Sequence, residues 1–488
     1  MCARFTSPEI KELLARYRDI WSIEYALSLL GWDMETYMPP AASAERGEVR
    51  GILETQIQRI YTHPEFIGLV EGAKPQNEFE EGVIRVLKRR IKYYTRLPRE
   101  FIEEEERTVT RAFQDWREAR AKSDFSIFMP TLERIVDLQR RKAEYLGYED
   151  HPYDALLDIY EEGLNLRKCE RMLAVVNEIS DLFKRLRERY PERHPIEEIE
   201  YDELFVRRLV DHVLTELGFD RSRARVDTSP HPFTVNMGLH DVRITVRYEG
   251  RDFKRPLMAA VHEFGHASYE MNIDEELRAT PLQRGASLGF HESQSRFWEN
   301  VVGRSRTFVR RFHEAMVMAI PELRGYDEED IYEYLTMVRP ELIRVEADEV
   351  QYPLHISLRF DLERGLVEGS VSVRELPEIW NDRMEELIGI RPPNDSLGVL
   401  QDIHWAHATI GYFPTYAIGS MIASQLYYRL NLRGAVEEGR YGEIMSVLRE
   451  KVHRYGSTYH PDELLRRATG EQLNPEYFLN YLREKYFG

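Results

Sequence analysis

Two histidines four residues apart, with a glutamate directly after the first, are the strongest chemical feature of the sequence. His262, Glu263 and His266 lie in the segment HEFGH. On one face of a helix, both imidazoles can reach a single divalent cation, and the glutamate can take a proton from water that the cation activates. Because 15 of the 488 residues are histidine, chance alone gives this pattern in about one of 20 such chains. The surrounding residues must therefore support the interpretation.

A third ligand is needed to complete such a site. One class of zinc peptidase would have glycine at 269 and histidine at 272, but the sequence has Tyr269 and Asn272, which excludes that class. Glu292 follows His266 by 26 positions in a second amphipathic segment and is the predicted third ligand, with Glu299 as the alternative. Two neutral imidazoles and one carboxylate leave zinc a net positive charge and an open position, as in a catalytic site.

The groups that orient the ligands are harder to identify from the sequence. A ligating histidine usually donates its other ring N–H to a carboxylate or a carbonyl. In many enzymes with this ligand set, an acidic residue four positions after the glutamate accepts that bond, but Arg296 stands there. The sequence therefore identifies no orienting partner. We interpret His291 as a group that lies behind the ligands or faces the substrate, with a packing role as the alternative.

A strand and a helix are expected to position these residues. Polar and apolar residues alternate strictly over residues 241–248, which is the period of a half-buried strand. Residues 233–238 are expected to pair with that strand in an antiparallel hairpin. The segment that carries the two histidines has apolar residues at helical spacing, which predicts an amphipathic helix. These apolar residues are Leu257, Ala260, Val261, Phe264 and Met271.

Helical periodicity dominates the rest of the chain. From Ser7 to about Leu217, apolar residues recur at three- and four-residue spacing. Proline-containing breaks separate these segments, but no linker rich in glycine or serine marks an independent domain. We therefore predict one mostly α-helical domain over residues 1–488, with an N-terminal helical part to about residue 225 and a catalytic part from about residue 226.

The composition excludes several kinds of partner. The 67 basic and 85 acidic residues give a net charge of −18, which repels phosphate backbones and anionic lipids, so neither nucleic acid nor membrane is an expected partner. No segment approaches the roughly 18 consecutive apolar residues of a membrane span, and the first residues lack the apolar core of a signal peptide. The two cysteines, Cys2 and Cys169, exclude a disulfide framework and favour the cytoplasm.

Six motifs stand in a characteristic order along the chain. They are GWDMETYMP at 31–39, HPF at 231–233, DVRIT at 241–245, HEFGH at 262–266, HESQ at 291–294 and QDIHW at 401–405. In these motifs and in its length, the chain resembles the carboxypeptidase Taq family of thermostable zinc metallocarboxypeptidases. The resemblance implies a helical fold like that of neurolysin and angiotensin-converting enzyme, a deep groove covered by the N-terminal part, a small antiparallel β-sheet beside the active site, and a homodimer.

The same resemblance implies an activity and a cofactor. The expected reaction is the release of C-terminal amino acids, with broad specificity, from peptides that have a free C-terminus. Water activated by zinc would attack the peptide bond, with Glu263 as the general base. One divalent metal per chain is expected, zinc by default, and the resemblance also allows cobalt to support activity.

A carboxypeptidase must recognise the terminal carboxylate of its substrate, and arginine suits this task because it can donate two parallel hydrogen bonds. The resemblance assigns this role to Arg344. Arg243, on the polar face of the predicted strand, is the rival, although an ion pair with Asp241 is the simpler interpretation of that residue. The resemblance also implies that His231 and His404 line the groove and bind substrate.

A negatively charged tetrahedral intermediate needs a preorganised donor, which lowers the barrier by on the order of 3 kcal/mol. By analogy with the wider fold group, Tyr412 is the expected donor, with Tyr416 as the alternative. Two other functions stay open at this point. One is a zinc oligopeptidase that cuts inside short peptides. The other is a helical binding protein with an inert metal site. The presence of all three predicted ligands and of the general base Glu263 argues against it.

Overall fold

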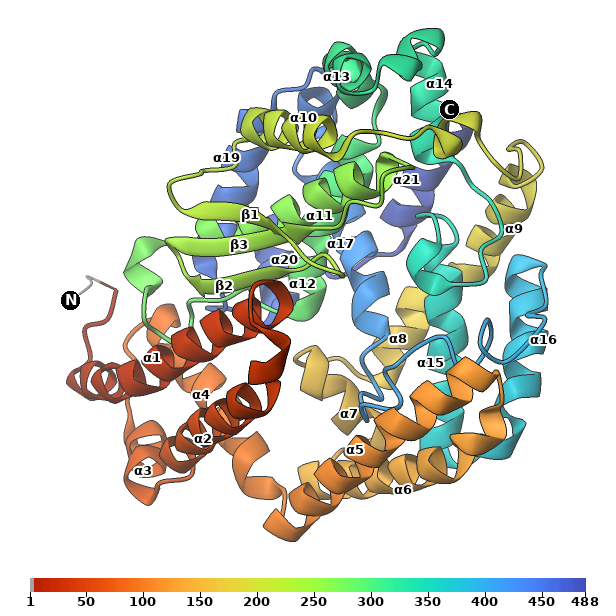
Figure 1. Cartoon of the computed structure of the whole chain (residues 1–488). Helices are drawn as coiled ribbons and strands as arrows, with labels where there is room; N and C mark the ends of the chain where they lie inside the picture. Colours follow the sequence, from red (N-terminus) through yellow and green to blue (C-terminus); the bar gives the residue numbers. More distant parts are fainter. Residues whose placement is uncertain (1–3) are drawn as a thin grey trace. The chain divides into compact units, whose positions relative to one another are not determined.

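The computed structural model describes residues 4–488, which are mostly helical with one small β-sheet (Figure 1). The chain divides into two compact units, each built from three separate segments. The described part of unit 1 comprises residues 4–94, Arg193–Leu335 and Ile422–Gln472, and unit 2 comprises Thr95–Glu192, Thr336–Met421 and Leu473–Gly488. The predicted division near residue 225 does not coincide with a boundary between these segments, and the predicted single domain stays a prediction.

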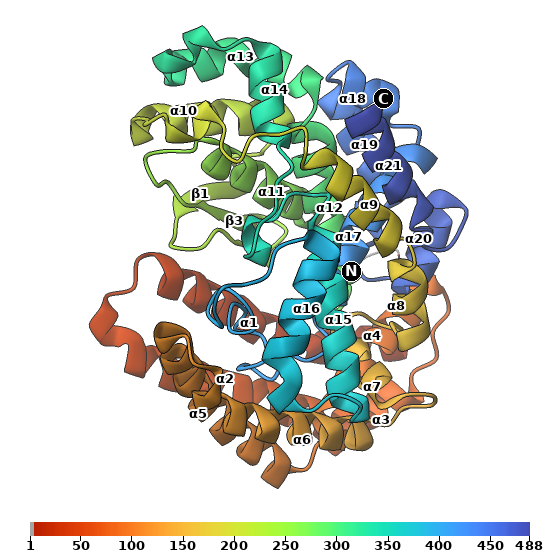
Figure 2. The same ribbon diagram turned by 90° about the vertical axis from the view of Figure 1, so that its right-hand side faces the viewer.

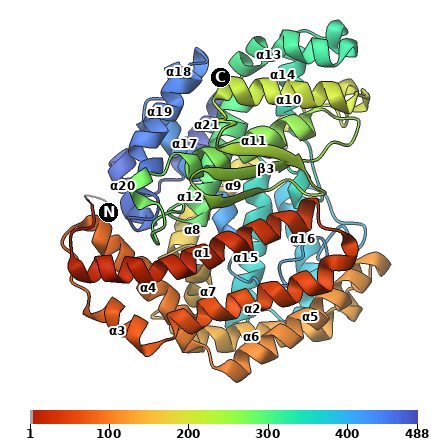
Figure 3. The ribbon, with the colours of Figure 1, turned by 60° about the vertical axis from the view of Figure 1, so that its left-hand side comes forward.

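Unit 1 contains the β-sheet. The helices α1 and α2 also belong to unit 1 and lie side by side (Figure 3). Two further helices, α4 (Glu78–Arg96) and α14 (Glu328–Thr336), end just beyond its boundary with unit 2. The helices that lie wholly in unit 1 are α1 (Pro8–Thr36), α2 (Ser43–Tyr61), α3 (Pro64–Gly72), α10 (Glu203–Leu217), α11 (Lys254–Met271), α12 (Leu288–Arg296), α13 (Arg306–Ala319), α18 (Arg433–Glu437), α19 (Tyr441–Lys451) and α20 (Pro461–Thr469).

Unit 2 is helical, and α15 and α16 pack side by side in it (Figure 2). The helix α15 is buried over nearly its whole length, which is typical of a central core helix. The helices of unit 2 are α5 (Arg99–Lys122), α6 (Met129–Leu146), α7 (Pro152–Tyr160), α8 (Leu166–Leu173), α9 (Val176–Leu186), α15 (Tyr352–Glu368), α16 (Leu376–Ile388) and α21 (Glu476–Phe487). One more helix, α17 (Pro414–Arg429), begins in unit 2 and ends in unit 1.

The sheet has three strands in the order β1-β3-β2. The predicted hairpin is confirmed, because β2 (Thr234–Gly238) pairs antiparallel with β3 (Asp241–Val246). The expectation of an entirely antiparallel sheet is wrong, because β1 (Ala224–Thr228) pairs with the other edge of β3 in parallel. The chain reverses direction once into β2 and again into β3, so β3 runs in the same direction as β1.

The two faces of the sheet have different neighbours. Val242 and Ile244 of β3 are fully buried, and α11 packs against this strand. Thr234 and Asn236 of β2 pair with Ile244 and Val242, and paired residues on adjacent strands point to the same face. Strand alternation therefore directs the polar side chains of Thr234 and Asn236 toward α11.

The opposite face of the sheet anchors the end of α1. The Arg243 guanidinium lies 4.1 Å from the ring centre of Trp32, and the Tyr37 hydroxyl donates a hydrogen bond to Asp227 at 2.8 Å. Both aromatic residues belong to the motif GWDMETYMP at 31–39. In this structure, the motif therefore fastens α1 to the sheet through cation–π and hydrogen-bond contacts.

None of the helices within residues 4–488 is both long enough and apolar enough to cross a membrane. Cys169 is buried and forms no disulfide bond, whereas Cys2 lies outside the described residues.

Candidate active site

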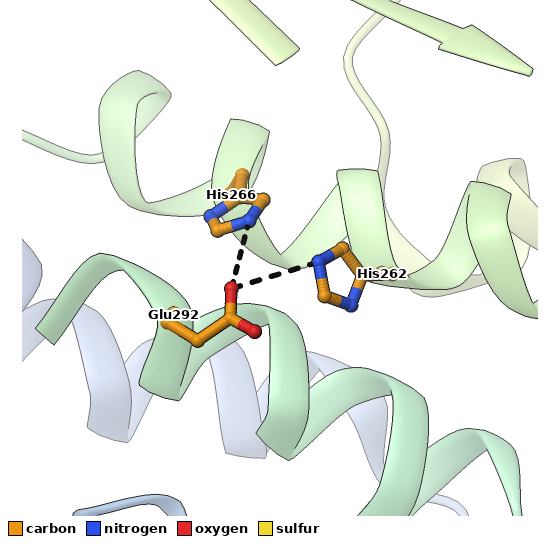
Figure 4. Close-up of side chains that lie close together, drawn as sticks. All are labelled: His262, His266 and Glu292. Atoms are coloured by element: carbon orange, nitrogen blue, oxygen red, sulfur yellow. Dashed lines mark ion pairs between the residues drawn. The ribbon is translucent and has the colours of Figure 1, made fainter. Parts of the chain in front are cut away.

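Three side chains from α11 and α12 converge in unit 1 (Figure 4). One oxygen of Glu292, Oε2, lies 3.7 Å from Nε2 of His262 and 3.4 Å from Nε2 of His266. Four ligands bound tetrahedrally to zinc at 2.0–2.2 Å would lie about 3.3 Å from one another. The three donor atoms therefore have both the chemistry and the spacing that a divalent cation requires.

A glycine in α11 allows the two helices to come this close. A Cβ atom on Gly265 would lie 2.4 Å from the carbonyl oxygen of Gln294 and 2.5 Å from Cα of Ser295. Real Cβ atoms do not approach backbone atoms so closely, so any larger residue would push α12 away from α11. Gly265 occupies a variable position of the HEXXH pattern, so the pattern itself predicts no role for it.

Glu263 directly follows His262 in α11 and is 6% exposed. The Thr234 hydroxyl donates a hydrogen bond to Oε2 of Glu263 at 2.6 Å, as the orientation of β2 requires. Burial raises the pKa of Glu263, although His262 and the Thr234 hydrogen bond oppose the shift. A carboxylate with a raised pKa is a stronger base, which suits a group that must accept a proton.

Glu299 supplies the orienting contact that the sequence did not identify. Its Oε2 lies 2.8 Å from Nδ1 of His262, on the opposite side of the ring from Nε2. Glu299 belongs to the π-helical turn η5 (Phe297–Gly303), which continues α12, and its other oxygen accepts a bond from Arg304 at 2.7 Å. With Nδ1–H donated to Glu299, the lone pair of His262 Nε2 is free to bind a cation.

A second chain of contacts orients His266. Its Nδ1 lies 2.6 Å from Nδ1 of His291, and Nε2 of His291 lies 2.7 Å from Oε1 of Glu270. The amide of Asn236 donates to the other oxygen of Glu270. Every hydrogen bond in this chain of contacts is satisfied when His291 donates to Glu270 and accepts from His266. This arrangement again leaves the lone pair of His266 Nε2 free to bind a cation. His291 thus lies behind a predicted ligand.

The protonation states of His266 and Glu292 favour cation binding, whereas that of His262 opposes it. Burial lowers the pKa of His266 to about 4, so this imidazole is neutral at pH 7. Burial opposes ionisation of Glu292, but Arg296 and His262 outweigh it and hold the pKa of that carboxyl well below its usual range. Burial also lowers the pKa of His262, yet Glu292 and Glu299 reverse this, and its pKa is raised. Cation binding must therefore compete with a proton at His262.

Arg344 belongs to a buried charged cluster in unit 2. Its Nε and Nη2 each lie 3.0 Å from Oδ1 of Asp402, and its Nη1 donates to the Tyr352 hydroxyl at 2.8 Å. Arg359 binds the other oxygen of Asp402, with its Nε at 2.6 Å. Two guanidiniums share one carboxylate, so these three side chains together carry one positive charge in excess. Burial opposes ionisation of Asp402, but Arg359 and Arg344 outweigh it and hold the pKa well below its usual range.

His404 and two tyrosines lie beside this cluster. Nε2 of His404 is 3.3 Å from the Tyr416 hydroxyl, and the rings of His404 and Tyr412 are 5.6 Å apart. The guanidinium of Arg344 lies 4.9 Å from the ring centre of Tyr416. Nδ1 of His404 is buried and has no hydrogen-bond partner within residues 4–488. Burial lowers the pKa of His404 to about 4, so the ring is neutral at pH 7.

A buried carboxylate, Glu363 of α15, holds the loop that carries these residues. It accepts hydrogen bonds from the Tyr153 hydroxyl at 2.7 Å, from Nε1 of Trp405 at 3.0 Å and from the backbone N–H of Gly411 at 2.8 Å. Burial raises its pKa to about 7. Trp405 adjoins His404 and Gly411 adjoins Tyr412 in sequence, so Glu363 fixes both ends of this segment.

Known proteins resemble this chain over nearly its whole length. The family model "Carboxypeptidase Taq (M32) metallopeptidase" matches residues 10–486. Thermostable carboxypeptidase 1 of Pyrococcus furiosus is 48% identical over 494 residues, which cover 99% of each chain. Carboxypeptidase 1 of Bacillus subtilis is 36% identical, and the match covers 98% of this chain and 97% of that protein. A solved structure of Pyrococcus furiosus carboxypeptidase superposes with a TM-score of 0.97 at 47% identity, covering 99% of this chain and 100% of that one.

The chain belongs to the carboxypeptidase Taq (M32) metallopeptidase family. Membership confirms the resemblance that the six motifs indicated, the mostly helical fold and the expectation of a metallocarboxypeptidase. A divalent metal is implied by the family, and the convergent atoms of His262, His266 and Glu292 are a candidate site for it.

Two further sequence predictions concern residues of this M32 chain that lie in unit 1. His231 has an exposed side chain in the loop before β2, and its carbonyl accepts a hydrogen bond from Ser229 at 2.5 Å. Arg243 forms a two-pronged ion pair with Asp241, with both contacts at 2.8 Å. This ion pair agrees with the simpler interpretation of Arg243. The position of Arg243 is explained without a role in substrate binding.

Proposed function

We propose that this M32 enzyme releases amino acids one at a time from the free C-terminus of peptides, with broad specificity. A divalent cation, zinc by default, would be held by His262, His266 and Glu292. The observation that carries the proposal is the convergence of three cation-binding atoms, in a chain that belongs to a metallocarboxypeptidase family.

When bound, a divalent cation polarises the scissile carbonyl and makes water a stronger acid. Glu263 accepts the proton of the attacking water and then delivers it to the leaving amine. Its raised pKa and its hydrogen bond from Thr234 support this assignment, because they give the carboxylate basicity and a fixed direction. Tyr412 donates to the oxygen that becomes negatively charged, and Tyr416 is the alternative donor.

We assign recognition of the substrate carboxylate to Arg344, with His404 and His231 as further substrate-binding residues. The excess positive charge of the cluster formed by Arg344, Asp402 and Arg359 supports an anionic ligand. The unpartnered Nδ1 of His404, 3.9 Å from Asp402, supports a polar ligand at the same cluster.

Mass spectrometry of a peptide mixture, with and without a chelator, tests the reaction. We expect stepwise shortening from the C-terminus that stops when the metal is removed. The same peptides with amidated C-termini should be cut far more slowly. Internal cleavage at equal rates in both forms would instead identify a zinc oligopeptidase, and turnover that survives complete removal of metal would contradict the proposed chemistry.

We further propose a cytoplasmic, thermostable homodimer in which cobalt can replace zinc. The low cysteine content and the free Cys169 suit a reducing compartment. Thermostability is supported by the name of the Pyrococcus furiosus relative. Light scattering on purified protein measures the mass of the assembly, and a monomer at micromolar concentration would contradict the dimer. Full activity of the cobalt-loaded apoprotein would support the exchange of metals.

A further inference from the structure

One arginine, Arg296, contacts both the candidate ligand Glu292 and the carboxylate of Glu299, which orients His262. Nε of Arg296 donates to Oε1 of Glu292 at 2.7 Å, and its Nη1 lies 3.5 Å from Oε2 of Glu299. Its side chain is only 15% exposed. Arg296 stands four positions after Glu292, where many enzymes with this ligand set have an acidic orienting residue.

The two oxygens of Glu292 are therefore in different surroundings. Oε1 is held by Arg296, whereas Oε2 faces Nε2 of both His262 and His266. The Ser295 hydroxyl, which donates to the backbone carbonyl of Glu292 at 2.7 Å, also lies 3.0 Å from Oε2. A charge-assisted bond to a guanidinium is among the stronger contacts available to a carboxylate. Rotation of Glu292 toward a cation would have to break that bond.

A carboxylate can bind a cation through one oxygen or through both. Binding through both would fill a position that a hydrolytic site must keep open for water and substrate. We propose that Arg296 is a positioning residue that holds Glu292 as a monodentate ligand, which binds through one oxygen. The position for water and substrate then stays open. This inference rests on the proposed metal site.

The position of Arg296 fits this role for a helical reason. It follows Glu292 by one helical turn, so both side chains lie on the same face of α12. The helix ends at Arg296 and continues as the π-helical turn η5, in which Glu299 reaches His262. Arg296 thus lies where it can hold Glu292 and also contact the carboxylate that orients the first histidine.

The test uses the apoprotein loaded with Co²⁺, whose visible absorption becomes weaker and shifts as the number of ligands rises. We expect R296Q to show a weaker cobalt spectrum than the wild type, because Glu292 then binds through both oxygens. R296K, which keeps one charged donor, should recover most of the wild-type spectrum. R304Q is the matched control for the loss of a contact with Glu299, because Arg304 binds the other oxygen of that carboxylate. An unchanged R296Q spectrum, or an equal change in R304Q, would overturn the proposal.

A second measurement needs no variant. X-ray absorption of the zinc-loaded wild type distinguishes one-oxygen from two-oxygen carboxylate binding through the distance from metal to carboxylate carbon. Two-oxygen binding in the wild type would overturn the role of Arg296 even if R296Q failed to fold. Failure of the wild type to take up any divalent metal at His262, His266 and Glu292 would instead refute the proposed function itself.

Discussion

Oε2 of Glu299 lies 2.8 Å from Nδ1 of His262, across 37 residues of sequence. The π-helical turn that carries Glu299 makes this contact possible, because it continues α12 past Arg296 while changing the direction of its side chains. Glu299 is therefore a carboxylate behind the candidate metal ligand. By sequence position alone, Glu299 is an alternative to Glu292 as the third ligand.

Replacing Glu299 with glutamine should weaken metal binding. The variant loses the charged acceptor that fixes the tautomer of His262, and loss of such a contact costs on the order of 10- to 100-fold in metal affinity. Competition with a chelator measures the affinity. Glu329, whose ion pair with Arg306 is exposed, gives a matched control in E329Q. Equal affinities of E299Q and the wild type would contradict the orienting role.

Replacing Glu263 with glutamine should separate chemistry from metal binding. Glutamine keeps the size and the contact with Thr234 but cannot accept a proton, so turnover should fall on the order of 10²- to 10⁴-fold. The zinc content, measured by elemental analysis, should stay at one ion per chain. A variant that retains full turnover would exclude Glu263 as the general base.

Replacing Arg344 with glutamine should abolish the preference for a free C-terminus. The wild type is expected to cut a free-acid peptide much faster than its amide, because the guanidinium binds the carboxylate. In R344Q the KM for the free acid should rise, and the two peptides should be cut at similar rates. R306Q, at an exposed ion pair, is the control. A preserved preference in R344Q would assign carboxylate recognition elsewhere.

Replacing Gly265 with alanine should damage the site without touching a ligand. The new Cβ would lie 2.4 Å from the Gln294 carbonyl, so α12 must move away and carry Glu292 with it. Overpacking of this kind should lower the free energy of unfolding by about 1–3 kcal/mol. We expect reduced metal affinity together with a lower melting temperature. Wild-type values for both would mean that α12 can move at no cost.

The buried carboxyl of Glu363 should make stability depend on pH. Its pKa is about 7 in the folded protein against an ordinary 4.5, so the folded state retains a proton that the unfolded state has lost between these values. Stability therefore falls as the pH rises from 4.5 through 7, by on the order of 3 kcal/mol. E363Q removes this titration. The difference between its urea midpoints at pH 5 and pH 8 should be smaller than in the wild type.

Asp348 serves as an internal reference for that measurement. Burial raises its pKa to about 7 as well, so it contributes the same pH dependence to the wild type and to E363Q. Only the difference between the two proteins reports on Glu363. If the urea midpoint changed by the same amount between pH 5 and pH 8 in the wild type and in E363Q, Glu363 would have an ordinary pKa in the folded state.

The sequence predicted the local elements of the site well. Alternation over residues 241–248 predicted β3, and apolar spacing predicted α11 with both histidines on one face. These signals come from neighbouring residues on one element, whose periodicity can be read directly. The strand β1 was missed, because it is five residues long and is recognised by its pairing with β3 rather than by its own pattern.

Contacts between elements could not be predicted in this way. Helical spacing assumes 3.6 residues per turn, and the π-helical turn breaks that rule just where Glu299 is placed. Gly265 was missed for a related reason, because its importance depends on how closely α12 approaches α11. Arg296 was noted only as a departure from an expected acidic residue. Its contact with Glu292 depends on a rotamer that spacing does not specify.

The alternation of the two units along the chain has a consequence for synthesis. The first segment of unit 1 ends at Tyr94, but its last segment begins only at Ile422, and unit 2 is completed only by the segment Leu473–Gly488. A nascent chain therefore exposes incomplete apolar surfaces until nearly all of it has left the ribosome. For the same reason, neither a shortened gene nor a single proteolytic cut can yield either unit as one continuous polypeptide.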